Sequence, residues 1–161
     1  MFNNKKERKD KMRYNLILSF VILLSFTACS TLTLEQADFS WPIESVLPVD
    51  DNGNVMEEKY SVAFNTRPLF FEEFQDSSAY LGKEIRLIRD QQGYYYVTSR
   101  EFKNVYIFQA EEGMLVLQNQ IPVSESGIIN PAFNQRTPYI ELIDGDNNRF
   151  SLTHEGIEGG M

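Results

Sequence analysis

The sequence predicts an all-β fold, a small antiparallel sandwich or closed barrel built on a β-meander. Two hairpins of similar design follow each other, and their loops, residues 90–93 and 110–113, both end in glycine. Glycine adopts the positive φ that tight hairpin turns require. The flanking strands carry apolar residues on both faces, whereas a sheet with one wet face alternates more cleanly. The second face therefore needs a cover, which a second sheet, long loops or a partner can supply.

Two segments precede the meander. Aromatic and aliphatic residues alternate with small ones over residues 57–64, which predicts a half-buried strand. Residues 65–76 fit two structures equally well. One is a short helix capped by Thr66 with Pro68 in its first turn, and the other is an edge strand interrupted at Pro68.

The meander and a final hairpin account for the other expected strands, over residues 83–89, 94–99, 102–109, 114–120, 139–143 and 149–153. A turn that pairs Asp90 with Gly93 closes the first hairpin. In that register Leu87 faces Tyr96. Residues 121–138, rich in proline, serine and glycine, read as a long connection.

Charge separates the chain into a basic head and an acidic body. The whole chain carries 15 basic and 23 acidic residues, for a net charge of −8. From Cys29 onward there are 9 basic and 21 acidic residues, a net of −12. An acidic body of this kind is a poor nucleic-acid ligand, because phosphate contacts need Lys and Arg. Anionic lipid surfaces should also repel it.

The basic head is followed by an apolar run, residues 16–29, that ends at the single cysteine, Cys29. The order of basic residues, apolar run and small residues is that of a secretory signal, and the run is too short to span a bilayer comfortably. Phe26, Thr27, Ala28 and Cys29 form a pattern that resembles the lipobox of bacterial lipoprotein precursors. Phe26 stands where leucine is usual.

This resemblance implies a signal peptide over 1–28, transfer of a diacylglyceryl group to the sulfur of Cys29, and cleavage before it. Palmitate-type chains would then anchor the protein on the extracytoplasmic side of a membrane. Ser30 is not the aspartate that retains lipoproteins in the inner membrane, which favours the outer membrane in a Gram-negative source. The alternatives are an uncleaved anchor, or a signal cut elsewhere with Cys29 as a buried thiol.

The remaining boundaries follow from this reading. Residues 1–11 are an optional start-site extension, because Met12 and Arg13 would begin a more compact leader. Residues 29–40 are expected to form a lipidated tether, 41–155 a single β domain, and 156–161 a flexible tail. With Cys29 lipidated, no disulfide can form within the chain.

A weak calcium pattern lies at the tip of the last hairpin. Asp144, Asp146 and Asn148 have the spacing of a calcium-loop start. Arg149 occupies the sixth position, where that loop needs glycine for its sharp turn. A polar hairpin tip is therefore favoured, and no metal or other cofactor is expected.

Tyr94, Tyr96 and Tyr106 are candidates for an exposed aromatic binding face. The competing interpretation, which we favour, is cross-strand packing in the core. His154 is the only histidine and lies near the predicted tail, where a structural or solvated role is expected.

No motif in the mature part identifies a reaction. The favoured hypothesis is a non-enzymatic, membrane-anchored envelope lipoprotein that contacts another envelope protein. A carbohydrate-binding module using surface tyrosines is the alternative. A carboxylate-based hydrolase is less favoured, because carboxylates adjacent in sequence on a strand point to opposite faces.

Overall fold

A five-stranded antiparallel sheet forms the centre of the computed structural model, which describes residues 44–145 and 148–159. In spatial order its strands are β1 (Ser45–Pro48), β4 (Glu84–Arg89), β5 (Tyr94–Thr98), β6 (Asn104–Glu111) and β7 (Met114–Pro122). The second, four-stranded sheet contains β11 (Gly156–Ile157), β10 (Asn148–Thr153), β9 (Tyr139–Asp144) and β8 (Pro131–Arg136). A separate hairpin pairs β2 (Asn54–Glu57) with β3 (Val62–Asn65), and helix α2 spans Arg67–Phe74.

The chain divides between Asp38 and Phe39, and every described residue belongs to the second part. The predicted signal peptide 1–28 and the predicted tether 29–40, with Cys29, lie outside the described residues. The antiparallel sheets confirm the all-β prediction, and of its two architectures the structure is sandwich-like because the sheets do not close into a barrel.

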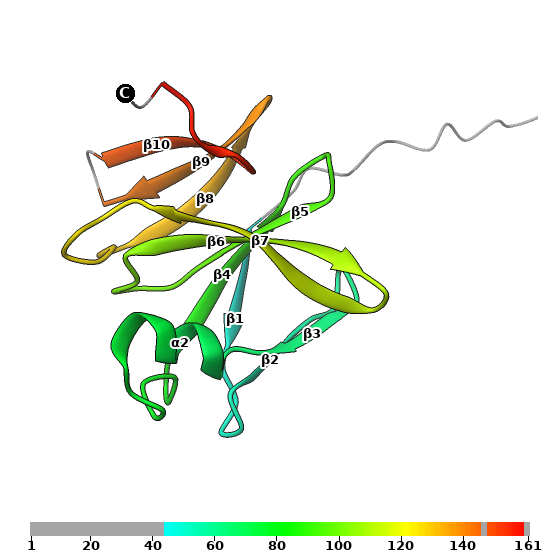
Figure 1. Cartoon of the computed structure of the whole chain (residues 1–161), viewed down its shortest axis with the longest axis vertical. Coiled ribbons are helices and arrows are strands. Elements are labelled where there is room, and N and C mark those ends of the chain that lie inside the picture. The colour runs from blue at the N-terminus through cyan, green and yellow to red at the C-terminus, as the bar shows by residue number, and fades with distance from the viewer. Residues whose placement is uncertain (1–43, 146–147, 160–161) are drawn as a thin grey trace, which may run out of the picture. The chain divides into compact units, whose positions relative to one another are not determined.

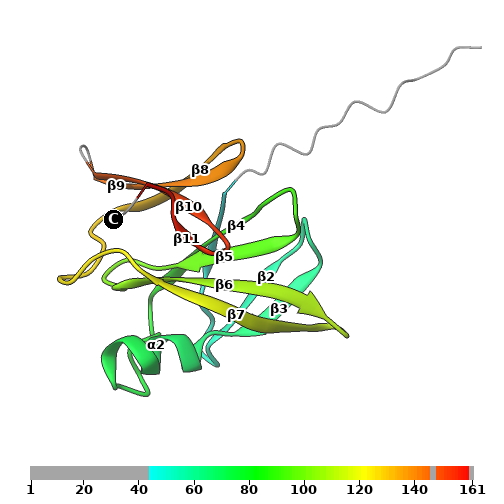
Figure 2. The same cartoon turned by 45° about the horizontal axis from the view of Figure 1, so that its top comes forward.

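The central sheet is covered on both faces, as its apolar pattern predicts. The four-stranded sheet lies on one side of it, and α2 with the β2–β3 hairpin lies on the other (Figures 1 and 2). The side facing the four-stranded sheet contributes the buried residues Ile88, Tyr96, Val105, Ile107 and Ile121. The side facing α2 contributes Leu47, Ile85, Leu87, Tyr95, Val97 and Tyr106.

Residues 67–74 adopt the helical alternative. Pro68 lies in the first turn, where its missing N–H costs nothing. Thr66 is buried at the N-cap position, but its hydroxyl donates to the carbonyl of Gly53, 2.8 Å away, and makes no cap bond. The rings of Phe70 and Phe74 both pack against core residue Phe102, with centroids 4.9 and 5.9 Å away, which places the helix against the core.

The predicted strand over 57–64 is correct at its two ends but wrong as one continuous strand, because residues 58–61 form a turn. β2 ends at Glu57 and β3 begins at Val62, and these two residues pair across a turn. The Glu57 carboxylate accepts the N–H of Lys59 within that turn, and Ser61 has a positive φ of 52°. Tyr60 still reaches the core from the turn and packs edge-on against Tyr95. The alternation of large and small residues therefore indicates which side chains are buried, although the strand is not continuous.

The register predicted for the first meander hairpin is wrong by one residue. Leu87 pairs with Val97, and Tyr96 pairs with Ile88. The reason is that Asp90 hydrogen-bonds to Tyr94, which leaves a three-residue loop closed by Gly93. A one-residue slip changes which side chains share a face.

Two further corrections concern the C-terminal third. The predicted connection 121–138 contains β8, whose first residue is Pro131, a position where a strand tolerates proline. The predicted flexible tail is wrong at its start, because Gly156 and Ile157 pair with Thr153 and Leu152 as β11. The N–H of Glu158 also donates to the carbonyl of Ser151.

The close approach of Gly127 to Glu101 generates a stability prediction. A Cβ on Gly127 would lie 2.7 Å from the Glu101 carbonyl oxygen, and Gly127 has a φ of 94°. We expect Gly127→Ala to lower the free energy of unfolding by about 3 kcal/mol, through clash and left-handed strain together. Gly82→Ala is the control, because Gly82 has a φ of 66° and open space around it, and it should lose only about 1 kcal/mol. Urea unfolding followed by circular dichroism measures both, and equal losses would show that the contact with Glu101 is not limiting.

Candidate functional site

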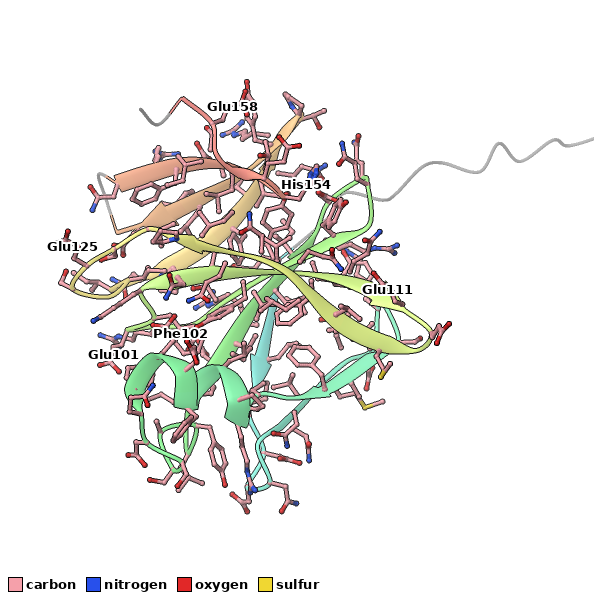
Figure 3. All side chains as sticks on the ribbon, viewed as in Figure 1. Glu101, Phe102, Glu111, Glu125, His154 and Glu158 are labelled. Carbon is pink, nitrogen blue, oxygen red and sulfur yellow. The ribbon has the colours of Figure 1, made fainter. Side chains whose placement is uncertain are left out.

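A cleft of about 300 Å³ opens where the β4–β5 turn of the central sheet meets one end of the four-stranded sheet. We call it the His154 cleft. Figure 3 labels His154 between these two parts and Glu158 farther out. The described residues that line the cleft are Asp90, Gln91, Gln92, Tyr96, Gln135, Thr137, Pro138, Tyr139, Ile140, Thr153, His154, Glu155 and Glu158.

Asp90 organises one side of the cleft. One oxygen of its carboxylate accepts the backbone N–H groups of Gln92 and Tyr94, both at 2.9 Å, which is the turn that aspartate side chains commonly form. The other oxygen accepts the hydroxyl of Tyr96 at 3.2 Å. Burial, followed by the nearby Asp90 charge, raises the pKa of Tyr96 well above its usual value. Tyr96 is therefore a neutral donor, and it holds the Asp90 carboxylate in place.

His154 forms the facing wall. Its ring stacks on Tyr94 with centroids 4.3 Å apart and an interplanar angle of 1°. The side-chain amide of Asn119, on β7, donates to the carbonyls of His154 and Glu155. The β10–β11 turn is thus fastened to the edge of the central sheet, which fixes the shape of the cleft.

The charged side chains that line the cleft are carboxylates, those of Asp90, Glu155 and Glu158. Among the described lining residues there is no Lys or Arg. Asp90 is engaged by the three donors described above, while Glu155 and Glu158 are exposed at the rim. The cleft therefore presents a negative rim around mostly neutral polar groups.

The predicted tyrosine face does not exist as one surface. Tyr96 and Tyr106 are 1% and 2% exposed, and they lie on opposite sides of the central sheet. The Tyr106 hydroxyl donates to Glu73 at 2.9 Å, and burial raises its pKa. The binding-face prediction is wrong and the competing prediction of core packing is confirmed for these two residues, because both faces of the sheet are covered. Tyr94 is partly buried beneath His154.

The calcium candidates are not gathered into a cation site. Asp144 is buried, and one carboxylate oxygen accepts the backbone N–H groups of Ile129 and Asn130 at 2.9 and 3.0 Å. Asn148 pairs with Asp144 across the hairpin, and Asp146 lies outside the described residues. In the described ranges no group of three or more His, Cys, Asp or Glu residues is placed to hold a metal ion. Asp144 instead anchors the loop before β8.

Among the carboxylates of the described residues, Glu73 accepts the most hydrogen bonds. It accepts from the backbone N–H groups of Lys103 and Asn104, the side-chain amide of Asn104 and the hydroxyl of Tyr106, at 2.8 to 3.2 Å. This arrangement fastens α2 to the start of β6. A carboxylate surrounded by four protein donors has a structural role. Glu73 is therefore a poor candidate for one of the two carboxylates of a hydrolase.

The outer edge of β7 is a second candidate site. β7 is the last strand of the central sheet, and its nine residues include no charged side chain. Met114 and Leu117 are 63% and 50% exposed. Figure 3 labels Glu111 near the tip of the hairpin that β7 forms with β6. Natural edge strands usually carry charges, prolines or bulges that discourage pairing. β7 ends at Pro122 and its register with β6 shifts at Gln118, so the stretch that has none of these features is Met114–Leu117.

Sequence reasoning missed the cleft because its walls come from turns of two different sheets. Gln135 and Thr137 entered no prediction, since β8 was not expected. The Thr137–Pro138 turn signal, between Arg136 and the apolar pair Tyr139 and Ile140, was the available clue. The uncharged stretch of β7 was visible in the sequence. It became a candidate binding site only when the structure showed that β7 is an edge strand.

Comparisons with known proteins do not assign the chain to a family. No protein family, no curated protein and no solved structure matches it. Within residues 44–145 and 148–159, no helix is long and apolar enough to cross a membrane.

The role of Asp90 leads to a prediction. Asp90→Ala removes the acceptor for two backbone N–H groups and the Tyr96 hydroxyl, so we expect the free energy of unfolding to fall by about 2 kcal/mol. Gln91→Ala is the control in the same turn, because Gln91 is exposed, and it should change stability by less than about 0.5 kcal/mol. Chemical denaturation of both variants tests this, and a neutral Asp90→Ala would mean that water replaces the carboxylate.

Proposed function

We propose that this chain is a membrane-anchored envelope lipoprotein whose β domain binds another envelope protein without catalysing a reaction. The lipobox pattern ending at Cys29 supports the anchor, and Ser30 supports the outer membrane if the source is Gram-negative. The observation that carries the binding function is the uncharged, exposed edge of β7.

The hydrogen-bond pattern of β7 suits strand addition. Glu111 and Met114 close a two-residue turn in which Glu112 and Gly113 both have positive φ. Hydrogen-bonded pairs alternate along an antiparallel ladder, so the backbone groups of Leu115 and Leu117 turn away from β6. An extended segment of a partner can add to such an edge through main-chain bonds, with its side chains read by the exposed apolar groups.

Charge defines the partner segment further. The chain carries a net charge of −12 from Cys29 onward. Glu111, the last residue of β6, and Glu112, in the turn, lie close to the start of β7. A partner strand with apolar residues along its length and basic residues at one end complements this edge. Electrostatic complementarity of this kind sets the speed and specificity of association.

The edge can be tested by crosslinking in cells. A photo-reactive residue replacing Gln118 in the full-length protein should capture one discrete envelope protein. Leu117→Lys places a charge on the edge and should reduce that product at least ten-fold. Val46→Lys is the matched control, because Val46 is 44% exposed on β1 at the opposite edge, and it should leave the product unchanged.

Two results of this experiment would contradict the binding function. One is the absence of any discrete product above background. The other is equal capture by the Leu117→Lys variant and the unmodified protein.

The anchor is tested separately. Cys29→Ser should abolish labelling by a palmitate analogue and move the protein out of the membrane fraction, because the thiol is the acceptor for the lipid. Ser30→Ala, at the next position, should be labelled and fractionated like the unmodified protein. Unchanged labelling of the Cys29→Ser variant would rule out the lipoprotein assignment, whatever the edge of β7 does.

A further inference from the structure

We propose that the His154 cleft binds a neutral saccharide, a function separate from partner binding at β7. The cleft of about 300 Å³ lies at the lower end of the range for small-molecule sites, roughly 300–1,000 Å³. Its lining residues are 90–92, 96, 135, 137–140, 153–155 and 158, none of which is on β7. β7 contributes the Asn119 amide behind the β10–β11 turn. The two surfaces can therefore be altered independently.

The charge of the cleft disfavours anionic ligands. A phosphate or carboxylate entering the cleft would meet Asp90, Glu155 and Glu158, and the described lining residues offer it no Lys or Arg. An anion without a cationic partner loses its hydration and gains repulsion. Anionic lipids, nucleotides and acidic glycans are therefore disfavoured.

The carboxylates also give little to a cationic ligand. Asp90 is already engaged by the Gln92 and Tyr94 N–H groups and by the Tyr96 hydroxyl. The Glu155 side chain is 84% exposed, so water and salt screen its charge. The cleft has no buried, unengaged carboxylate among its described residues that could pair with an ammonium group.

What remains available is a set of neutral hydrogen-bonding groups. The side-chain amides of Gln91, Gln92 and Gln135 line the cleft from opposite sides and make no hydrogen bond with the described part of the chain. An amide presents donors and an acceptor side by side, and Thr137 adds a hydroxyl. Sugar hydroxyls also donate and accept, so neighbouring hydroxyls of one ring match such amides.

The cleft also offers apolar surface for the ring itself. Pro138 and the partly exposed Tyr139 lie beside Gln135, and the C–H face of a sugar ring packs on such surfaces. The stack of His154 on Tyr94 holds the opposite wall in one orientation. Fixed walls lower the ordering cost of binding, which matters for a small ligand with few contacts.

A glycan array tests the proposal directly. The purified full-length protein, in a detergent without a sugar headgroup, is applied to neutral, uronic-acid and amino-sugar oligosaccharides. We expect binding confined to neutral glycans. Titration calorimetry with the best neutral glycan should show at least a ten-fold loss of affinity for Gln135→Ala and for Thr137→Val.

Gln120→Ala is the matched control, because Gln120 is an exposed glutamine on β7 outside the cleft, and it should bind like the unmodified protein. Circular dichroism should show all three variants folded. No signal on the array, stronger signals for uronic or amino glycans, or full affinity in both cleft variants would overturn the proposal. None of these results alters the crosslinking at β7, so the two proposals fail separately.

Discussion

The central sheet is apolar on both faces, and this constraint determines what must lie on either side of it. Leu87 and Ile88 are adjacent on β4, point to opposite faces, and are both fully buried. Burial of one such side chain contributes roughly 1.5–3 kcal/mol, and either face left open would forfeit several of these contributions. The helix with its hairpin and the four-stranded sheet are therefore both required. Their turns and edges, in turn, form the cleft and leave β7 open.

Hydrogen bonds to carboxylates attach α2 and the four-stranded sheet to the central sheet. Glu73 ties α2 to the start of β6 through four donors. Glu44, just before β1, accepts the backbone N–H of Phe133 on β8 and a guanidinium N–H of Arg86 on β4. Burial raises the pKa of Glu44, although both partners favour its charged form. Apolar packing is not directional, so such bonds select one placement of each cover over others of similar buried area.

The sequence predicted those parts of the fold that depend on local patterns. The meander, the Gly113 turn and the need for a second cover all follow from residue types over short spans. The helix at Pro68 was one of two structures that the sequence fitted equally well. The register at Asp90 did not, because one hydrogen bond to Tyr94 decides between loops of different length. β8 was hidden among prolines and serines. The burial of Tyr96 and Tyr106 depends on elements distant in sequence that pack on each face of the central sheet. The cleft could not be predicted either, because it exists only where turns of two sheets meet.

The proposed anchor also bears on how an acidic domain can work beside a membrane. A tether of residues 29–40 would span at most roughly 40 Å when extended, at about 3.3–3.6 Å per residue. Repulsion from anionic headgroups falls off over a Debye length of about 8 Å at physiological ionic strength. A domain held by such a tether can therefore occupy positions beyond the reach of that repulsion while its lipid remains inserted. The proposed anchor would at the same time confine the β7 edge and the cleft to a thin layer, which would raise the effective concentration of any partner held in the same layer. A weak, strand-sized contact is then sufficient, and the acidic body favours a basic partner over the surrounding lipid.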